Sequence, residues 1–185
     1  MGDDYTPYYA REGDVIELYF TPGAASLAVH GVLEEVGAEY RLVRVTKAVL
    51  PHMRAAGHGR IINISSVLGL VPGPFMASYV ATKHAIEGYS ESVDHEVRQH
   101  GVRVLLVEPA WTRTSLDANS IQPDAPLPIY AQQRRTFDGV IARAMADGDD
   151  PSIVANAIVA AATDRKPKVR YTAGSLSGRV SAARR

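Results

Sequence analysis

Residues 59–66 have the sequence GRIINISS, a short, mostly apolar run that ends in two serines. The near-continuous apolar character of residues 60–64 predicts a strand that is buried on both faces, as strands of parallel sheets are. A helix is predicted just before it, from Thr46 to about Ala56, because Gly57 and Gly59 follow as stop signals. The serines therefore come directly after a central strand.

Helices and strands alternate on both sides of this strand. Downstream, the spacing predicts a helix over residues 78–100, a second apolar strand over 102–107 and a long loop over 109–128. The other predicted elements are strands at 15–20, 40–45 and 169–172 and helices at 24–36, 130–145 and 152–162, with a loose tail at 1–14 and a basic tail at 176–185. The alternation predicts an α/β fold, a mostly parallel sheet with flanking helices.

Three residues near the central strand have the chemistry of a proton-transfer site: Ser66, Tyr79 and Lys83. Tyr79 and Lys83 are four residues apart near the start of a predicted helix, so they share one face. An ammonium one turn away favours the phenolate form of a tyrosine, which can then exchange a proton with an alcohol or carbonyl oxygen. A serine hydroxyl can hold that oxygen. The alternative is an ordinary amphipathic Tyr-x-x-x-Lys pair.

Four segments resemble consecutive blocks of the short-chain dehydrogenase/reductase family: TKAVLPHM (46–53), GRIINISS (59–66), YVATKHA (79–85) and VEPAWTRT (107–114). The resemblance covers residues 46–175 and implies the catalytic half of an incomplete Rossmann-type fold. It implies that Ser66 orients an alcohol or carbonyl substrate, and that Tyr79 is the acid/base and also contacts the cofactor. It further implies that Lys83 favours the phenolate and holds the nicotinamide ribose of NAD or NADP. Ser66 is preferred to Ser65 because it stands thirteen residues before Tyr79, the usual interval of the family.

The last of these segments resembles the loop of the family that lies beside the nicotinamide. By this resemblance Pro109, Thr112 and Thr114 are cofactor contacts, and Ala110 replaces the usual glycine, a mild departure if its φ is negative. The family's Thr-Gly-x-x-x-Gly-x-Gly run, which lets the backbone approach a pyrophosphate, has no counterpart in these 185 residues. The family's helix asparagine is also missing, since its place falls near Ala38.

Residues 16–45 resemble a different family, the bacterial glutathione transferases, whose first strand, helix and strand they match. Ala25 stands where bacterial members often carry a cysteine, and Ser26 is either a contact to a glutathione sulfur or a helix N-cap. The two resemblances together predict a chimera with its join near residues 41–45. They leave three functions open: an NAD(P)-dependent oxidoreductase, an inactive remnant that acts as an interaction module, and a glutathione-binding fragment.

The composition narrows the choice of partners and compartment. Acidic and basic residues number 20 each, so the chain has no net charge that would attract nucleic acid or an anionic membrane. No apolar run is long enough for a membrane span. The absence of cysteine excludes disulfides and thiolate metal sites, the histidines show no metal spacing, and a cytoplasmic location is expected. A homo-oligomer is expected through the helices at 46–56 and 78–100, with apolar candidates Ile86, Tyr89, Val93 and Val97.

Overall fold

A computed structural model of the chain describes residues 16–20, 40–114 and 126–183, with side chains from residue 46 onward. The helices and strands are β1 (Ile16–Phe20), β2 (Tyr40–Arg44), α2 (Val45–Ala56), β3 (Gly59–Ile64), α3 (Ala77–Val97), β4 (Val102–Pro109), α4 (Ala131–Ala146), α5 (Pro151–Thr163), β5 (Arg170–Ala173) and α6 (Ser175–Ala183). Short 3-10 turns cover Val67–Gly69, Arg98–His100 and Pro128–Tyr130. The predicted alternation of strands and helices is confirmed wherever the chain is described.

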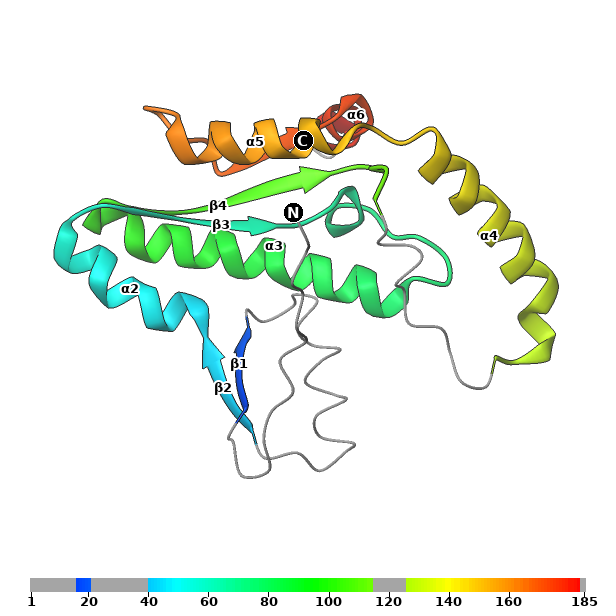
Figure 1. Cartoon of the computed structure of the whole chain (residues 1–185), viewed down its shortest axis with the longest axis horizontal. Helices are drawn as coiled ribbons and strands as arrows, with labels where there is room; N and C mark the ends of the chain where they lie inside the picture. The colour runs from blue at the N-terminus through cyan, green and yellow to red at the C-terminus, as the bar shows by residue number, and fades with distance from the viewer. Residues whose placement is uncertain (1–15, 21–39, 115–125, 184–185) are drawn as a thin grey trace, which may run out of the picture.

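The central sheet is parallel, with the strand order β3-β4-β5. Figure 1 shows β3 and β4 side by side. Ile64 at the end of β3 pairs with Val107 of β4, and Pro109 at the end of β4 pairs with Ala173 of β5. The carboxyl ends of all three strands therefore meet at one edge. Open parallel sheets bind their ligands at this edge.

Helices cover both faces of the sheet. Val102 and Val104 of β4 pack with Ile61 and with apolar residues of α2 and α3, whereas Leu105 and Val107 pack with α5 and β5. Val102 and residues 104–107 are 0% exposed. The apolar strand predicted at 102–107 is confirmed as β4, which is buried on both faces because its alternating side chains enter two separate cores.

β3 is less enclosed than the sequence predicted. Ile61 and Asn63 are buried, but Ile64 is 39% exposed and the remaining residues are half-buried. Within the described part of the chain, β3 pairs with β4 alone, and β1 pairs in parallel with β2 as a separate two-stranded sheet. The strands predicted at 15–20 and 40–45 are thus present but do not extend the sheet next to β3.

The helix predicted at 24–36, with Ala25 and Ser26, lies outside the described residues, as do the tail at 1–14 and most of the loop before residue 126. The resemblance of residues 16–45 to the start of a glutathione transferase therefore stays a prediction. No described helix has both the length and the apolar character needed to cross a membrane.

The C-terminal segment differs from the solvated basic tail that we expected. Residues Ser175–Ala183 form α6, which lies beside β5 (Figure 1), and Ser177 and Ser181 are buried. The Ser177 hydroxyl donates to the carbonyl of Glu108 at 2.5 Å. A helix whose small polar side chains bond the backbone of a core strand carries no strong hydrophobic periodicity, which explains why the pattern missed it.

The apolar face expected to join two copies is mostly used within the chain. Ile86 and Val97 are 2% and 5% exposed, and Val93 packs against the core that contains Val104. α3 then ends at Val97, followed by the 3-10 turn and by Gly101 in the left-handed region at φ 73°. Of the expected oligomer residues, Tyr89 alone is left half-buried and outside these core clusters.

Candidate active site

Ser66 lies in the turn that leaves β3 at the carboxyl edge of the sheet. The preceding peptide is fixed, since Ser65 N donates to the Val107 carbonyl at 2.8 Å. Ser66 Oγ accepts from Leu68 N at 3.1 Å and caps the 3-10 turn Val67–Gly69. The cap uses the oxygen as an acceptor and leaves the hydroxyl proton available as a donor.

Tyr79 and Lys83 lie in the first two turns of α3 and are both half-buried. Lys83 Nζ donates to the Ile64 carbonyl at 2.9 Å and lies 5.5 Å from the centroid of the Tyr79 ring. Burial lowers the pKa of Lys83, while the carboxylate of Glu87 acts in the opposite direction. Lys83 therefore joins the helix that carries Tyr79 to the strand that leads into Ser66.

The Ser66 turn packs directly on α3, and Gly69 permits this contact. A Cβ at Gly69 would lie 3.0 Å from the Lys83 carbonyl and 2.6 Å from Ser65 Oγ, so a side chain there would push the turn away from the helix. Asn63 adds a second link, because its Nδ2 donates to Ser90 Oγ at 2.9 Å in the buried interface between β3 and α3. The sequence expectation that Ser66, Tyr79 and Lys83 lie on adjoining elements agrees with this packing.

The segment after β4 is anchored at the same edge of the sheet. Ala110 N donates to the Ala173 carbonyl at 3.3 Å, and Thr112 Oγ1 donates to the Ala110 carbonyl at 3.2 Å. Arg113 Nη1 donates to the Gly148 carbonyl at 2.6 Å, which ties this loop to the turn before α5. Ala110 has a negative φ, since Phe75 is the non-glycine residue with positive φ in the described chain, so alanine fits there without strain.

Pro109, Thr112 and Thr114 lie at or just beyond the carboxyl end of β4, the strand next to β3. Pro109 ends β4, Thr112 is half-buried and forms a β-bridge with Asp149, and Thr114 is exposed. Since β3 and β4 are neighbours, the turn after one strand and the loop after the other open at one edge. The cofactor contacts of these residues stay a prediction.

Comparison with known proteins gives the same assignment for this region. Residues 41–125 match the sequence model of the short chain dehydrogenase family, starting within the predicted join. Residues 41–125 belong to the short-chain dehydrogenase family. The match contains Ser66, Tyr79, Lys83 and the segment from Pro109 to Thr114.

Relatives of this family align with much of the chain. An uncharacterized oxidoreductase, YusZ of Bacillus subtilis, is 33% identical over 165 residues, which covers 81% of this chain and 59% of that protein. A short-chain dehydrogenase from Streptomyces avermitilis superposes with a TM-score of 0.61 at 33% identity, covering 75% of this chain and 50% of that one. A short-chain dehydrogenase/reductase from Burkholderia phymatum in complex with NAD gives a TM-score of 0.56 at 26% identity, covering 68% and 47%. The chain spans about half the length of the relatives that it matches.

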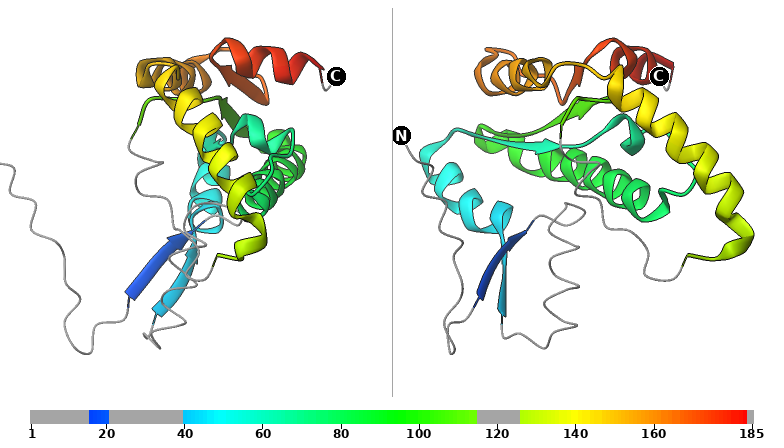
Figure 2. Two further views of the ribbon diagram at one scale, coloured as in Figure 1. Left: turned by 90° about the vertical axis from the view of Figure 1, so that its right-hand side faces the viewer. Right: turned by 45° about the vertical axis from the view of Figure 1, so that its right-hand side comes forward.

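Two features of the site region had no signal in the sequence. One is Phe75, whose φ of 57° is strained for an aromatic residue. The centroid of its ring lies 6.3 Å from the ring centroid of Tyr130 and 5.8 Å from that of Phe137. Phe75 borders a groove of about 420 Å³ beside α4. Figure 2 shows that α4 runs past the end of the sheet where β3 and β4 terminate. The groove is lined by Pro74, Phe75, Gln132, Gln133, Thr136, Phe137 and Val140.

The other is a group of buried charged side chains that begins one helical turn after Lys83. Glu87 and Glu108 have side chains only 5% and 0% exposed, and both pair with Arg170 of β5. These three residues are far apart in the sequence. Charge spacing along one helix could not reveal them, because the partners come from three elements.

Proposed function

We propose that this chain is the catalytic portion of an NAD(P)-dependent oxidoreductase that acts on an alcohol or a carbonyl compound. The position of Lys83 carries the proposal: its amine is 2.9 Å from the Ile64 carbonyl and 5.5 Å from the Tyr79 ring centroid. One amine therefore links the turn that bears Ser66 with the phenol. Open parallel sheets bind their ligands at the edge where β3 and β4 end, which supports a substrate site beside the Ser66 turn.

Each of the three residues has a separate part in the proposed reaction. Ser66 donates its free hydroxyl proton to the substrate oxygen and holds it in place. Tyr79 takes the proton from the alcohol oxygen in the oxidative direction and returns it to the carbonyl oxygen in the reductive direction. Lys83 keeps two of its three N–H donors free after bonding Ile64, and these orient the phenol and a ribose hydroxyl.

Bound NAD or NADP would accept or supply the hydride. Lys83, Thr112 and Thr114 would hold the nicotinamide end, because Lys83 bonds the last residue of β3 and the two threonines follow the end of β4. The residues fit this half of a dinucleotide. For the pyrophosphate half, the 185 residues contain no Thr-Gly-x-x-x-Gly-x-Gly run.

Fluorescence titration of the full chain with NADH and NADPH, followed by turnover of a panel of alcohols and ketones, tests the proposal. The panel should include 3-ketodihydrosphingosine, since a 3-ketodihydrosphingosine reductase of Bacteroides thetaiotaomicron is 41% identical over 102 residues, covering 52% of this chain and 37% of that protein. Tyr79→Phe is expected to lower turnover by about 10²-fold or more and to preserve cofactor binding. Tyr89→Phe on the same helix is the matched control. No binding at millimolar cofactor would refute the proposal for the isolated chain.

An interaction module is the second candidate, and the single described neighbour of β3 favours it. β3 pairs with β4 alone among the described residues, and an open strand edge invites association with another chain. A module of this kind needs no cofactor. Size-exclusion chromatography with light scattering separates the candidates, because a clean monomer without partners would count against the module.

A further inference from the structure

Arg170 of β5 makes contact with three carboxylates. Its Nη2 lies 3.1 Å from Glu87 Oε2, its Nε lies 2.9 Å from Glu108 Oε1, and its Nη1 pairs with Glu91. Glu87 and Glu91 come from α3, and Glu108 comes from β4. A single guanidinium thus joins a helix to two adjacent strands, a role for which its planar set of donors is suited.

The three carboxylates differ in their access to water. The side chain of Glu91 is 43% exposed, whereas those of Glu87 and Glu108 are 5% and 0% exposed. A buried carboxylate is strongly destabilising without a cationic partner. Arg170 therefore stabilises the charge of two carboxylates that water cannot solvate well.

Each segment of the proposed active site touches this charge cluster. Glu87 is one helical turn from Lys83 and opposes the effect of burial on the pKa of that amine. A Cβ at Gly69, in the turn capped by Ser66, would lie 3.1 Å from Glu87 Cγ. Glu108 directly precedes Pro109. The cluster lies where the Ser66 turn, the helix of Lys83 and the loop after β4 converge.

We propose that Arg170 is a positioning residue, which acts on Lys83 through Glu87 and keeps the Ser66 turn and the Pro109 loop in a fixed position relative to Lys83. The proposal rests on the proposed function, since it concerns the same site. Arg170 neutralises part of the charge that Glu87 presents to Lys83. It lies outside residues 41–125, so the family match does not include it.

The groups that act on Lys83 come from three sides. Tyr79 and Glu87 belong to its own helix, and the uncharged Ile64 carbonyl comes from β3. Arg170 acts from β5 by way of Glu87, and Glu91 of α3 and Glu108 of β4 pair with the same guanidinium. Without Arg170, the carboxylate of Glu87 attracts the amine of Lys83 more strongly, which favours the ammonium form. Removing the charge of Glu87 has the opposite effect on the same amine.

Competitive labelling of Lys83 by an amine-reactive reagent, read by mass spectrometry of its peptide across pH, measures this directly on the full chain. At a fixed alkaline pH, Arg170→Gln is expected to slow labelling of Lys83 about threefold to tenfold, and Glu87→Gln is expected to accelerate it by a similar factor. Arg170→Lys, which keeps the charge, should remain closer to the wild type. Glu96→Gln, which removes an exposed carboxylate from the same helix, is the matched control and should change nothing.

Opposite changes in the two variants support the proposal, because a merely structural role would not move one amine in two directions. Equal labelling rates in all variants, or changes of the same sign, overturn it. If Arg170→Gln does not fold, Glu87→Gln still tests the link, because a labelling rate equal to that of Glu96→Gln would show that Glu87 has no effect on Lys83 and would overturn the proposal. Labelling needs neither cofactor nor turnover, so an inactive chain with the expected shifts refutes the oxidoreductase alone, and an active chain without them refutes the positioning role alone.

Discussion

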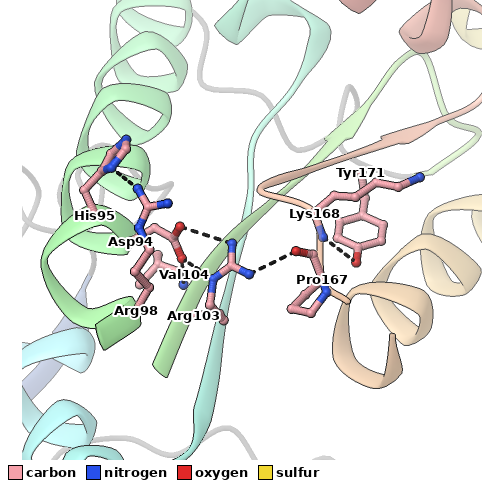
Figure 3. A network of polar contacts seen from close by, with 8 residues as sticks. All are labelled: Asp94, His95, Arg98, Arg103, Val104, Pro167, Lys168 and Tyr171. Carbon is pink, nitrogen blue, oxygen red and sulfur yellow. Dashed lines mark hydrogen bonds and ion pairs between the residues drawn. The ribbon is translucent and has the colours of Figure 1, made fainter. Parts of the chain in front are cut away.

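Replacing Asp94 by asparagine is expected to destabilise the fold strongly, because Asp94 closes a buried charged network at the amino-terminal end of β4 (Figure 3). Its side chain is 1% exposed. Oδ1 accepts from Arg103 Nε at 2.8 Å and from Val104 N at 2.9 Å, and Oδ2 accepts from Arg103 Nη2 at 3.1 Å. The carboxylate thereby fixes α3, the helix that bears Tyr79 and Lys83, to the central strand.

The magnitude follows from these bonds. Asparagine keeps one acceptor for Val104 N but presents an NH₂ group to a guanidinium that can only donate. Each hydrogen bond to a charged group contributes about 1.5–3 kcal/mol, and removing one partner of a fully buried pair costs about 3–5 kcal/mol. Because the Arg103 side chain is 23% exposed and still donates to the Pro167 carbonyl, we expect a loss of about 2–4 kcal/mol.

Urea unfolding followed by circular dichroism measures this loss as the difference in the free energy of unfolding. Glu96→Gln, an exposed carboxylate on α3, is the control and should stay within about 0.5 kcal/mol of the wild type. In the double variant with Arg103→Met, the cost should fall below the sum of the single costs, since the two side chains are in contact. A loss below about 1 kcal/mol, or strict additivity, would refute the reasoning.

Three further outcomes follow from individual contacts. Gly101→Ala should cost at least about 2 kcal/mol in the same urea assay, because φ is 73° and the new Cβ would collide with the Gly57 carbonyl oxygen; full stability would contradict the close approach. Burial and Asp164 raise the pKa of Tyr171 above its ordinary 10.0, so its contribution to stability is complete below that pH and is lost as pH rises further; Tyr171→Phe should lack this decline in thermal unfolding scans. Burial lowers the pKa of Lys83 below 10.5, so the free energy of unfolding should rise as pH passes through the lowered pKa, and Lys83→Met should lack the rise.

Local sequence patterns predicted the elements that carry the site. The apolar run at 60–64, the strand at 102–107 and the helix beginning near residue 78 all occur, because hydrophobic periodicity and glycine stops act over a few residues. The predicted burial of β3 on both faces holds only in part, because Ile61 packs in one core and Ile62 against the other while Ile64 is 39% exposed. How exposed β3 is depends on which strand lies next to it. A strand's own residues do not determine that neighbour.

Long-range partners could not be predicted in the same way. Arg170 reaches Glu87 across 83 positions of the chain, and Arg60 reaches the Ala161 carbonyl across 101. Such pairs require the tertiary fold before they can be recognised. The positive φ of Phe75 is likewise invisible in the sequence, because no turn preference places phenylalanine there.

Side chains of α3 bond the sheet at successive points along the helix. These bonds explain how the sheet of β3, β4 and β5 can fix the position of the residues in the proposed active site. Lys83 bonds β3 near the carboxyl edge, Glu87 pairs with β5, Ser90 bonds Asn63 in the middle of the interface, and Asp94 bonds the start of β4. Each of these contacts uses the helix face that repeats every three to four residues. A helix fixed in this way cannot slide or rotate without breaking several buried polar bonds at once. The distance between Tyr79 and the Ser66 turn is therefore controlled by side chains well removed from either hydroxyl.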